Sequence, residues 1–132
     1  MIRRWAAALR AGRISKATSA FALPVVVSNS GPPITLRSAD EVAVFNITLP
    51  CGARVVRVLD VGRYVTATFE LTARRGPGAG CGAGVGQRAY TAFLIRNGRI
   101  AAWRRVGAPD GRPSRGAPRL PGRTPPPGTQ AA

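Results

Sequence analysis

A chain of 132 residues, 45% of them hydrophobic, is long enough for one domain with its own core, and this composition excludes a fully disordered protein. Twenty lysines and arginines against five acidic residues give a net charge of +15, which favours a polyanion such as nucleic acid as a partner. The sequence has no histidine and only two cysteines without a C-x-x-C pair, so we expect neither a metal site nor a cofactor.

The high charge has a second explanation in the composition itself. Lys16 is the only lysine, and the other cations are arginines scattered through a chain rich in alanine, glycine and proline. The codon bias of a GC-rich genome produces such a composition without any function for the charge. We favour this compositional explanation and keep nucleic-acid binding as the alternative.

The beginning of the chain predicts two short helices. Apolar residues recur at helical spacing in residues 2–9, and Gly12 follows as a stop signal. The same spacing returns in residues 14–21, which places Phe21 on a second helix that has to end before Pro24.

Two short strands and a third helix follow. Residues 25–29 (VVVSN) and 34–37 (ITLR) read as strands on either side of an S-G-P-P turn. Ser38 and Glu41 form the S-x-x-E capping box that starts the third helix, and Pro50 ends it. A glycosylation sequon (N-I-T) lies inside this helix, and we interpret it as a chance match.

After the third helix the period of the apolar residues changes from 3.6 to 2. Four stretches therefore predict successive antiparallel strands: 53–61, 63–75, 88–96 and 99–106. The Asn-Gly dipeptide between the last two predicts a tight hairpin. The glycine-rich connection 76–86 predicts a mobile loop. The second of these strands has one apolar face and one threonine-rich face, which is typical of a sheet with one side on a core.

These elements predict an α+β domain over residues 1–106, in which a four-stranded antiparallel meander and the short strands are wrapped by three N-terminal helices. Residues 107–132 lack periodicity and are almost half proline or glycine, so we predict a disordered basic tail. No stretch approaches the roughly 20 apolar residues of a membrane span. The apolar run at residues 5–9 is also too short for the core of a signal peptide. We therefore expect a cytoplasmic protein without membrane contact.

The closing hairpin FLIRNGRIAAWRRV and the helical opening MIRRWAAALRAGRISKATSAFALP resemble the nuclear transport factor 2-like superfamily. This superfamily includes the SnoaL-like polyketide cyclases, ketosteroid isomerase and limonene-epoxide hydrolase, and the resemblance covers about residues 1–106. It implies that the curved sheet forms a cone and that the helices close it around an apolar pocket.

Trp103 and Arg105 lie two positions apart on the last predicted strand, and therefore on one side of it. The resemblance implies that they point into the pocket near Phe69 and Phe93. There they would suit a small apolar or anionic ligand, or one that carries a carbonyl group. The alternative is that Trp103 belongs to the core and Arg105 reaches solvent at the rim.

The acids of the superfamily's enzymes find no clear counterpart in this chain. Where limonene-epoxide hydrolase-like sites have an aspartate two residues after the tryptophan of the closing strand, this chain has Arg105. Thr68 and Glu70 stand where an Arg-x-Asp pair would be expected, and Glu70 shares the threonine-rich face. We predict a non-catalytic protein or one of unknown activity, with Glu70 as the one candidate acid. An atypical isomerase, cyclase or epoxide hydrolase is the alternative.

The predicted function is that of a small-molecule-binding protein, which forms a homodimer through the face that carries Tyr64, Thr66 and Thr68. Binding of nucleic acid through the scattered arginines and the basic tail is the competing prediction. Nucleic-acid binding usually combines basic residues with exposed aromatic rings. In this chain the phenylalanines and tryptophans occupy apolar faces instead.

Cys51 and Cys81 are expected at the same end of the sheet. Folding the meander about its first turn places residue 51 opposite about residue 73, next to the glycine-rich loop that carries Cys81. A disulfide between them would pin this loop over one end of the cone. We slightly favour two free thiols, which a reducing cytoplasm would maintain, over this disulfide.

Overall fold

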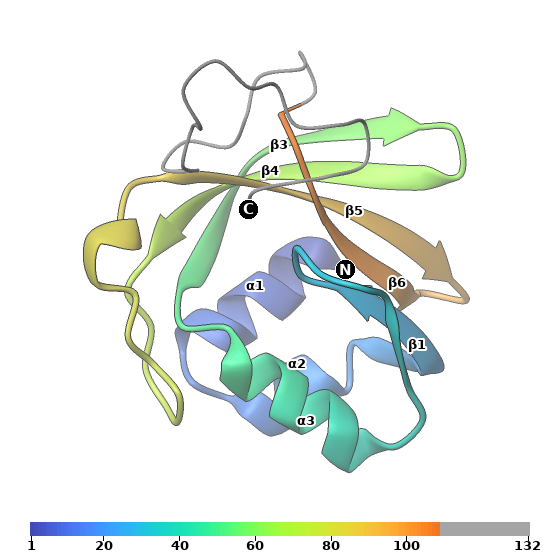
Figure 1. Ribbon diagram of the computed structural model, residues 1–132, viewed down its shortest axis with the longest axis horizontal. Helices are drawn as coiled ribbons and strands as arrows, with labels where there is room; N and C mark the ends of the chain where they lie inside the picture. Colours follow the sequence, from blue (N-terminus) through green and yellow to red (C-terminus); the bar gives the residue numbers. More distant parts are fainter. Residues whose placement is uncertain (109–132) are drawn as a thin grey trace.

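The computed structural model describes residues 1–108, so the predicted tail lies outside the described residues from residue 109 onward. The helices and strands, labelled as in Figure 1, are α1 (Ile2–Arg10), α2 (Ile14–Thr18), β1 (Phe21–Ser28), β2 (Ile34–Leu36), α3 (Ala39–Thr48), β3 (Gly52–Val61), β4 (Tyr64–Thr72), β5 (Arg88–Arg96) and β6 (Arg99–Val106). Among the described residues, no helix has the length and apolar character that crossing a bilayer requires.

The two N-terminal helices form as predicted, but the second is shorter. The apolar stripe of α1 is buried, and the helix ends before Gly12, whose φ of +74° suits glycine. A Cβ at Gly12 would lie 2.6 Å from the carbonyl carbon of Arg75, so this position also needs the absence of a side chain. The prediction that Phe21 extends α2 is wrong. Phe21 begins β1, where its partner is Ile100 of β6, because this pairing buries the ring.

The capping box at the start of α3 is confirmed. The Glu41 amide donates to the Ser38 hydroxyl oxygen over 3.2 Å, and the Glu41 carboxylate accepts from the Ser38 amide over 3.1 Å. The same carboxylate accepts from the Arg37 amide over 2.9 Å, and this hydrogen bond lowers the pKa of Glu41. The cap fixes where the chain leaves β2 and enters the helix.

The strands of residues 1–108 belong to one six-stranded sheet in the order β2-β1-β6-β5-β4-β3. The antiparallel meander of β3 to β6 follows the prediction, and β1 adds a parallel pairing with β6 that no local sequence signal indicates. The register of β1 against β6 shifts between Phe21 and Val26, around Pro24, which has no amide hydrogen for the ladder. The sheet is therefore mixed, with its last strand between its first and its fifth.

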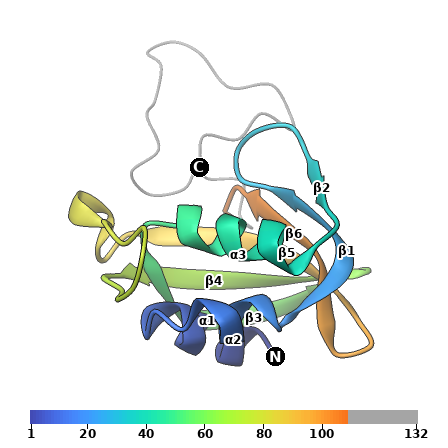
Figure 2. The ribbon, with the colours of Figure 1, turned by 90° about the horizontal axis from the view of Figure 1, so that it is seen from below.

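Figures 1 and 2 show the three helices gathered in the bend of the curved sheet, which gives the predicted α+β cone. Six aromatic rings that are at most 9% exposed meet between them: Trp5, Phe21, Phe45, Phe69, Phe93 and Trp103. Their contacts are edge-to-face, with ring centroids 5.0 to 6.4 Å apart. Each such pair adds about 0.5–1.5 kcal/mol beyond the burial of its area.

The two faces of β4 differ as the alternation predicts. Ala67 and Phe69 are buried on the side of the helices, whereas Thr66 and Thr68 are half-exposed on the other side. β4 ends at Thr72 and not at residue 75 as predicted, because the chain there turns toward α1 and α3.

The glycine-rich loop 76–86, for which the sequence predicts mobility, has several backbone contacts with the rest of the protein. The amides of Gly80 and Gly86 donate to the carbonyl oxygens of Pro50 and Leu71 over 3.0 and 2.8 Å. A Cβ at Gly78 would lie 2.0 Å from the Ile47 carbonyl oxygen, so the loop packs closely against the end of α3. Its backbone is thus tied to the protein at several points.

Candidate ligand-binding cavity

A cavity of about 170 Å³ lies between α1, the residues that follow α3 and the concave face of the sheet. The side chains around it are Trp5, Leu9, Leu49, Pro50, Cys51, Ala53, Phe69, Leu71, Ala89, Thr91, Trp103 and Arg105. Most of the lining is apolar and buried, whereas Pro50, Cys51, Leu71 and Arg105 are at least partly exposed and mark its outer end. A second, more open hollow of about 340 Å³ beside α2 contains none of the predicted site residues.

Trp103 lies on the cavity wall and also belongs to the hydrophobic core. Trp103 is 2% exposed, and its ring packs edge-to-face on the ring of Phe45 with the two centroids 5.0 Å apart. On the neighbouring strand its partner is Phe93. Within residues 1–108 its buried indole nitrogen Nε1 has no hydrogen-bond partner. An unpaired buried N–H costs about 1–3 kcal/mol, so this donor is a notable exception in the core.

Arg105 also lines the cavity, on the same side of β6. Its guanidinium carbon lies 5.9 Å from the centroid of the Trp103 ring, within the range of a cation–π contact. Burial lowers the pKa of Arg105, and within the described part of the chain its Nε atom has no hydrogen-bond partner. Its direct neighbour on β5 is Thr91, which gives the cavity one polar wall.

The structure brings three of the four predicted ligand-binding residues to this cavity. Phe69 lines it together with Trp103 and Arg105, while Phe93 is fully buried in the aromatic cluster and is not part of the lining. Thr91, which the sequence analysis missed, could have been found from its place on β5 two residues before Phe93 and hence on the same face.

Trp5 is a second residue that the sequence analysis did not place in the site. It lines the cavity and contacts the rings of Phe21, Phe69, Phe93 and Trp103. Its Nε1 atom donates to the side-chain oxygen of Asn46 over 2.9 Å. The side-chain nitrogen Nδ2 of Asn46 in turn donates to the Val42 carbonyl oxygen over 3.0 Å. Asn46, the asparagine of the N-I-T sequon, is fully buried and has a structural role here.

Glu70, the candidate catalytic acid, lies outside the cavity. Its carboxylate pairs with Arg54 over 2.9 Å, and both side chains are well exposed. The two residues are cross-strand partners of β3 and β4 on the face that points away from the helices. Among residues 1–108, no three His, Cys, Asp or Glu side chains come together as ligands for a metal ion.

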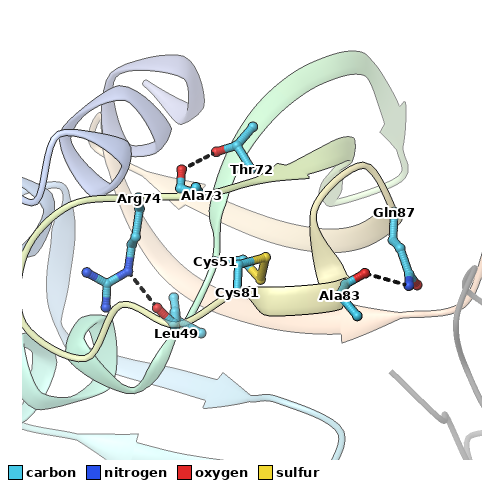
Figure 3. The surroundings of a disulfide bond; sticks show 8 residues. All are labelled: Leu49, Cys51, Thr72, Ala73, Arg74, Cys81, Ala83 and Gln87. Carbon is cyan, nitrogen blue, oxygen red and sulfur yellow. Dashed lines mark hydrogen bonds between the residues drawn. A yellow bond between two sulfur atoms is a disulfide. The ribbon is translucent and has the colours of Figure 1, made fainter.

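Cys51 and Cys81 are joined by a disulfide in the structure, with their Cα atoms 4.4 Å apart. Figure 3 shows the bond between the start of β3 and the glycine-rich loop. A Cβ at Gly84 would lie 3.1 and 3.2 Å from the two sulfur atoms, so the loop folds closely over the bond. Cys51 also lines the cavity, and the disulfide therefore forms part of its outer end.

Arg74 is a buried cation that the sequence analysis did not single out. Its Nε atom donates to the Leu49 carbonyl oxygen over 2.7 Å, as Figure 3 shows. Its terminal nitrogens donate to the carbonyl oxygens of Ile47, Arg75 and Pro77 over 3.1, 2.8 and 2.8 Å. Two of these acceptors lie at the end of α3, where carbonyl groups lack helical partners. Arg74 thus joins α3, β4 and the glycine-rich loop.

No model of a protein family matches the sequence, and neither does any curated protein. Solved structures do match. A proposed polyketide cyclase from Sinorhizobium meliloti aligns with a TM-score of 0.61 at 16% identity over 80% of this chain and 92% of the other. A protein from Catenulispora acidiphila with a ketosteroid isomerase-like fold, in complex with trimethylamine, aligns with a TM-score of 0.62 at 13% identity over 81% of this chain and 84% of the other.

An NTF2-like protein of unknown function from Cytophaga hutchinsonii gives a TM-score of 0.59 at 11% identity over 83% of this chain and 88% of its own. At these identities the likeness concerns the fold. The structures agree in fold with the superfamily that the closing hairpin and the helical opening resemble. The chain thus has the α+β cone fold of the nuclear transport factor 2-like and SnoaL-like proteins.

Proposed function

We propose that the protein binds a small organic molecule in the cavity and that a hydrogen-bond acceptor of this molecule is directed at the wall formed by Trp103 and Arg105. The observation that carries the proposal is that two of the three buried side-chain atoms without hydrogen-bond partners in residues 1–108 belong to residues of this wall, the third being the Thr18 hydroxyl oxygen beside the second hollow. Buried donors are almost always paired in folded proteins. A ligand acceptor would complete the hydrogen bonding of the wall, and the apolar side chains would hold the rest of the molecule.

Binding is a better-supported function for this cavity than the proton-transfer chemistry of the superfamily's enzymes. Such chemistry needs a base next to the substrate. The residues that line the cavity in the described chain include no acid, and Glu70 is engaged by Arg54 on the opposite face. The structure from Catenulispora acidiphila contains trimethylamine, which is a cation near neutral pH. Arg105 disfavours a cation in the cavity of this chain.

Isothermal titration calorimetry with single-ring probes tests the proposal. Benzamide, benzyl alcohol and benzoate each combine one ring with an acceptor, and we expect at least one of them to bind at millimolar concentrations. The variant Ala53→Leu, which puts a larger side chain into the cavity, should lose this binding. Ala73→Leu makes the same change at an exposed position and should retain it. Failure of all three probes, or equal loss in both variants, would contradict the proposal.

The predicted homodimer is a separate proposal. Tyr64, Thr66 and Thr68 lie half-exposed on the face of β4 opposite the helices, in reach of a second copy. Sedimentation velocity should give a dimer for the unmodified protein and a monomer for Thr66→Arg. A monomer at all concentrations excludes this interface.

Nucleic-acid binding is the alternative for the high positive charge. It has less support, because the tryptophan and phenylalanine rings of the described chain are all buried and cannot stack on bases. Binding of single-stranded DNA that falls steeply with salt and is insensitive to Ala53→Leu would favour this alternative.

The cytoplasmic location stays a prediction, and the Cys51–Cys81 disulfide is an observation against it. Disulfides are rare in reducing compartments. Counting free thiols in protein that is alkylated inside the producing cells would decide whether the bond exists there.

A further inference from the structure

We infer that the ligand of the cavity is a carboxylate carried by a single aromatic ring, with the carboxylate at Arg105 and the ring against Trp5 and Phe69. This inference rests on the proposed function and narrows it in charge, size and orientation. Three observations carry it: the unpaired charge of Arg105, the volume of the cavity and the polarity of its walls.

The negative charge expected of the ligand follows from the surroundings of Arg105. The ion pair of Arg54 with Glu70 lies on the other face of the sheet, and within residues 1–108 no carboxylate pairs with Arg105. None of the residues around the cavity is acidic. Arg105 is partly exposed and, within residues 1–108, its buried Nε atom has no partner. A neutral ligand that covers Arg105 would remove more of its guanidinium group from water without a counter-charge, which is unfavourable. An anion would offset it and would form charge-assisted hydrogen bonds, which are about twice as strong as neutral ones.

The size follows from the volume of about 170 Å³. An apolar cavity of about 150 Å³ accommodates one benzene ring. The cavity therefore accommodates one ring with a small substituent, whereas the fused rings of a steroid or a cyclised polyketide would project through its partly exposed outer end.

The orientation follows from the distribution of polar atoms. Arg105 and Thr91 are cross-strand partners and form the polar wall, and Arg105 lies at the more exposed end. Trp5, Leu9 and Phe69 form the deep part and are at most 2% exposed. The rings of Trp5 and Phe69 are already in edge-to-face contact, an arrangement that a further aromatic ring can extend. A planar carboxylate matches the guanidinium group of Arg105 geometrically.

Calorimetric titration with benzoate, benzamide and benzylamine tests the charge, because these three probes share the ring and differ in being anionic, neutral and cationic at neutral pH. We expect benzoate to bind roughly 10- to 100-fold more tightly than benzamide, the factor that a charge-assisted hydrogen bond supplies, and benzylamine not to bind. This comparison uses the unmodified protein and needs no variant to fold.

Two neighbouring arginines give the matched variants. Arg105→Met removes the charge from the cavity and retains an unbranched side chain, whereas Arg104→Met makes the same change on the exposed face of β6. Benzoate affinity should fall roughly 10- to 100-fold in Arg105→Met and stay within a factor of about two in Arg104→Met. Circular dichroism and the thermal midpoint establish that both variants are folded. An equal loss in both would mean that benzoate responds only to the high net charge, and the inference would fall.

The outcomes separate the inference from the function on which it rests. If benzamide binds as tightly as benzoate, or binds when benzoate does not, the anionic ligand is excluded and the binding function stands. If a four-ring carboxylate such as cholate displaces benzoate with higher affinity, the size limit is wrong. If no single-ring probe binds, the proposed function fails together with the inference.

Discussion

Two arginines at the same end of the meander, Arg74 after β4 and Arg105 near the end of β6, differ in how their nitrogen atoms are paired. Burial lowers the pKa of both Arg74 and Arg105. Arg74 donates to four carbonyl oxygens, so its environment replaces the water that it lost. Arg105 leaves its Nε atom unpaired within the described chain and lies over an indole ring at the edge of a cavity.

The two tryptophans repeat this contrast. The indole nitrogen of Trp5 donates to Asn46, whereas that of Trp103 has no partner in residues 1–108. Trp5 and Arg74, whose N–H groups are hydrogen-bonded, each join segments that are far apart in sequence and thereby stabilise the fold. Trp103 and Arg105, which each have an N–H group without a partner in residues 1–108, share one wall of the cavity. The presence or absence of a hydrogen-bond partner at these four N–H groups therefore separates structural side chains from candidate ligand-binding side chains.

The largest expected effect is on the structural arginine. Arg74→Met leaves four carbonyl oxygens without their donor, two of them at the end of α3, and should lower the free energy of unfolding by roughly 3–5 kcal/mol. Urea denaturation measures this difference. Its neighbour Arg75 has an exposed side chain, and Arg75→Met should change stability by less than about 0.5 kcal/mol. Equal effects of the two changes would refute the structural role of Arg74.

The disulfide should have the next largest effect. It closes a loop of 30 residues in sequence separation, and replacing Cys51 and Cys81 by serine should cost about 3 kcal/mol. Because the bond and Arg74 hold the same junction, their effects should not add. We expect Arg74→Met to cost at least 1 kcal/mol less in the serine background than in the unmodified protein, as a rough double-mutant coupling. Additive losses would mean that the two devices act independently.

The two tryptophans allow the same comparison between a paired and an unpaired N–H group, with a smaller expected effect on stability. Trp5→Phe and Trp103→Phe remove similar ring volumes, but only the first leaves the buried Asn46 oxygen without its donor. We expect Trp5→Phe to be about 2 kcal/mol more destabilising than Trp103→Phe in urea denaturation. A larger loss for Trp103→Phe would show that its indole nitrogen contributes to stability after all.

The smallest expected effect is that of Arg105→Met on the stability of the ligand-free protein. Removing a partly buried charge that has no ion-pair partner within residues 1–108 leaves no group unsatisfied and should change the free energy of unfolding by at most about 1 kcal/mol, toward greater stability. Thermal denaturation of Arg105→Met beside Arg104→Met measures it. A loss of several kcal/mol would place Arg105 with Arg74 among the structural arginines and would contradict its role in binding.

Local sequence patterns account for most of the secondary structure. The capping box at Ser38, the Asn-Gly hairpin and the period of two after Cys51 each depend on neighbouring residues, and each is found in the structure. The position of Trp103 and Arg105 on one side of β6 also follows from alternation. The wrong assignment of Phe21 arose because a helical spacing of apolar residues can continue into a strand that is buried at its first residue.

The remaining features depend on contacts between distant segments. The pairing of β1 with β6 joins residues about 75 positions apart, and nothing in either strand specifies the partner. Asn46 occupies the buried stripe of α3 with Val42, which is the one sequence signal for its role, but its bond to Trp5 spans 41 residues. Arg74 is one of two adjacent arginines at the end of a strand, and alternation alone could not tell which one turns inward. The cavity depends on all of these contacts together.

The place of β6 in the sheet has a consequence for synthesis on the ribosome. β1 emerges early, yet apart from the three-residue strand β2 its partner in the sheet is the last strand of the domain. Until residues 99–106 have been made, the inward-facing valines of β1, Val25 and Val27, lack the strand that completes their cover. We therefore expect the nascent chain to depend on chaperones until translation has passed residue 106, and to become protease-resistant in a single late step.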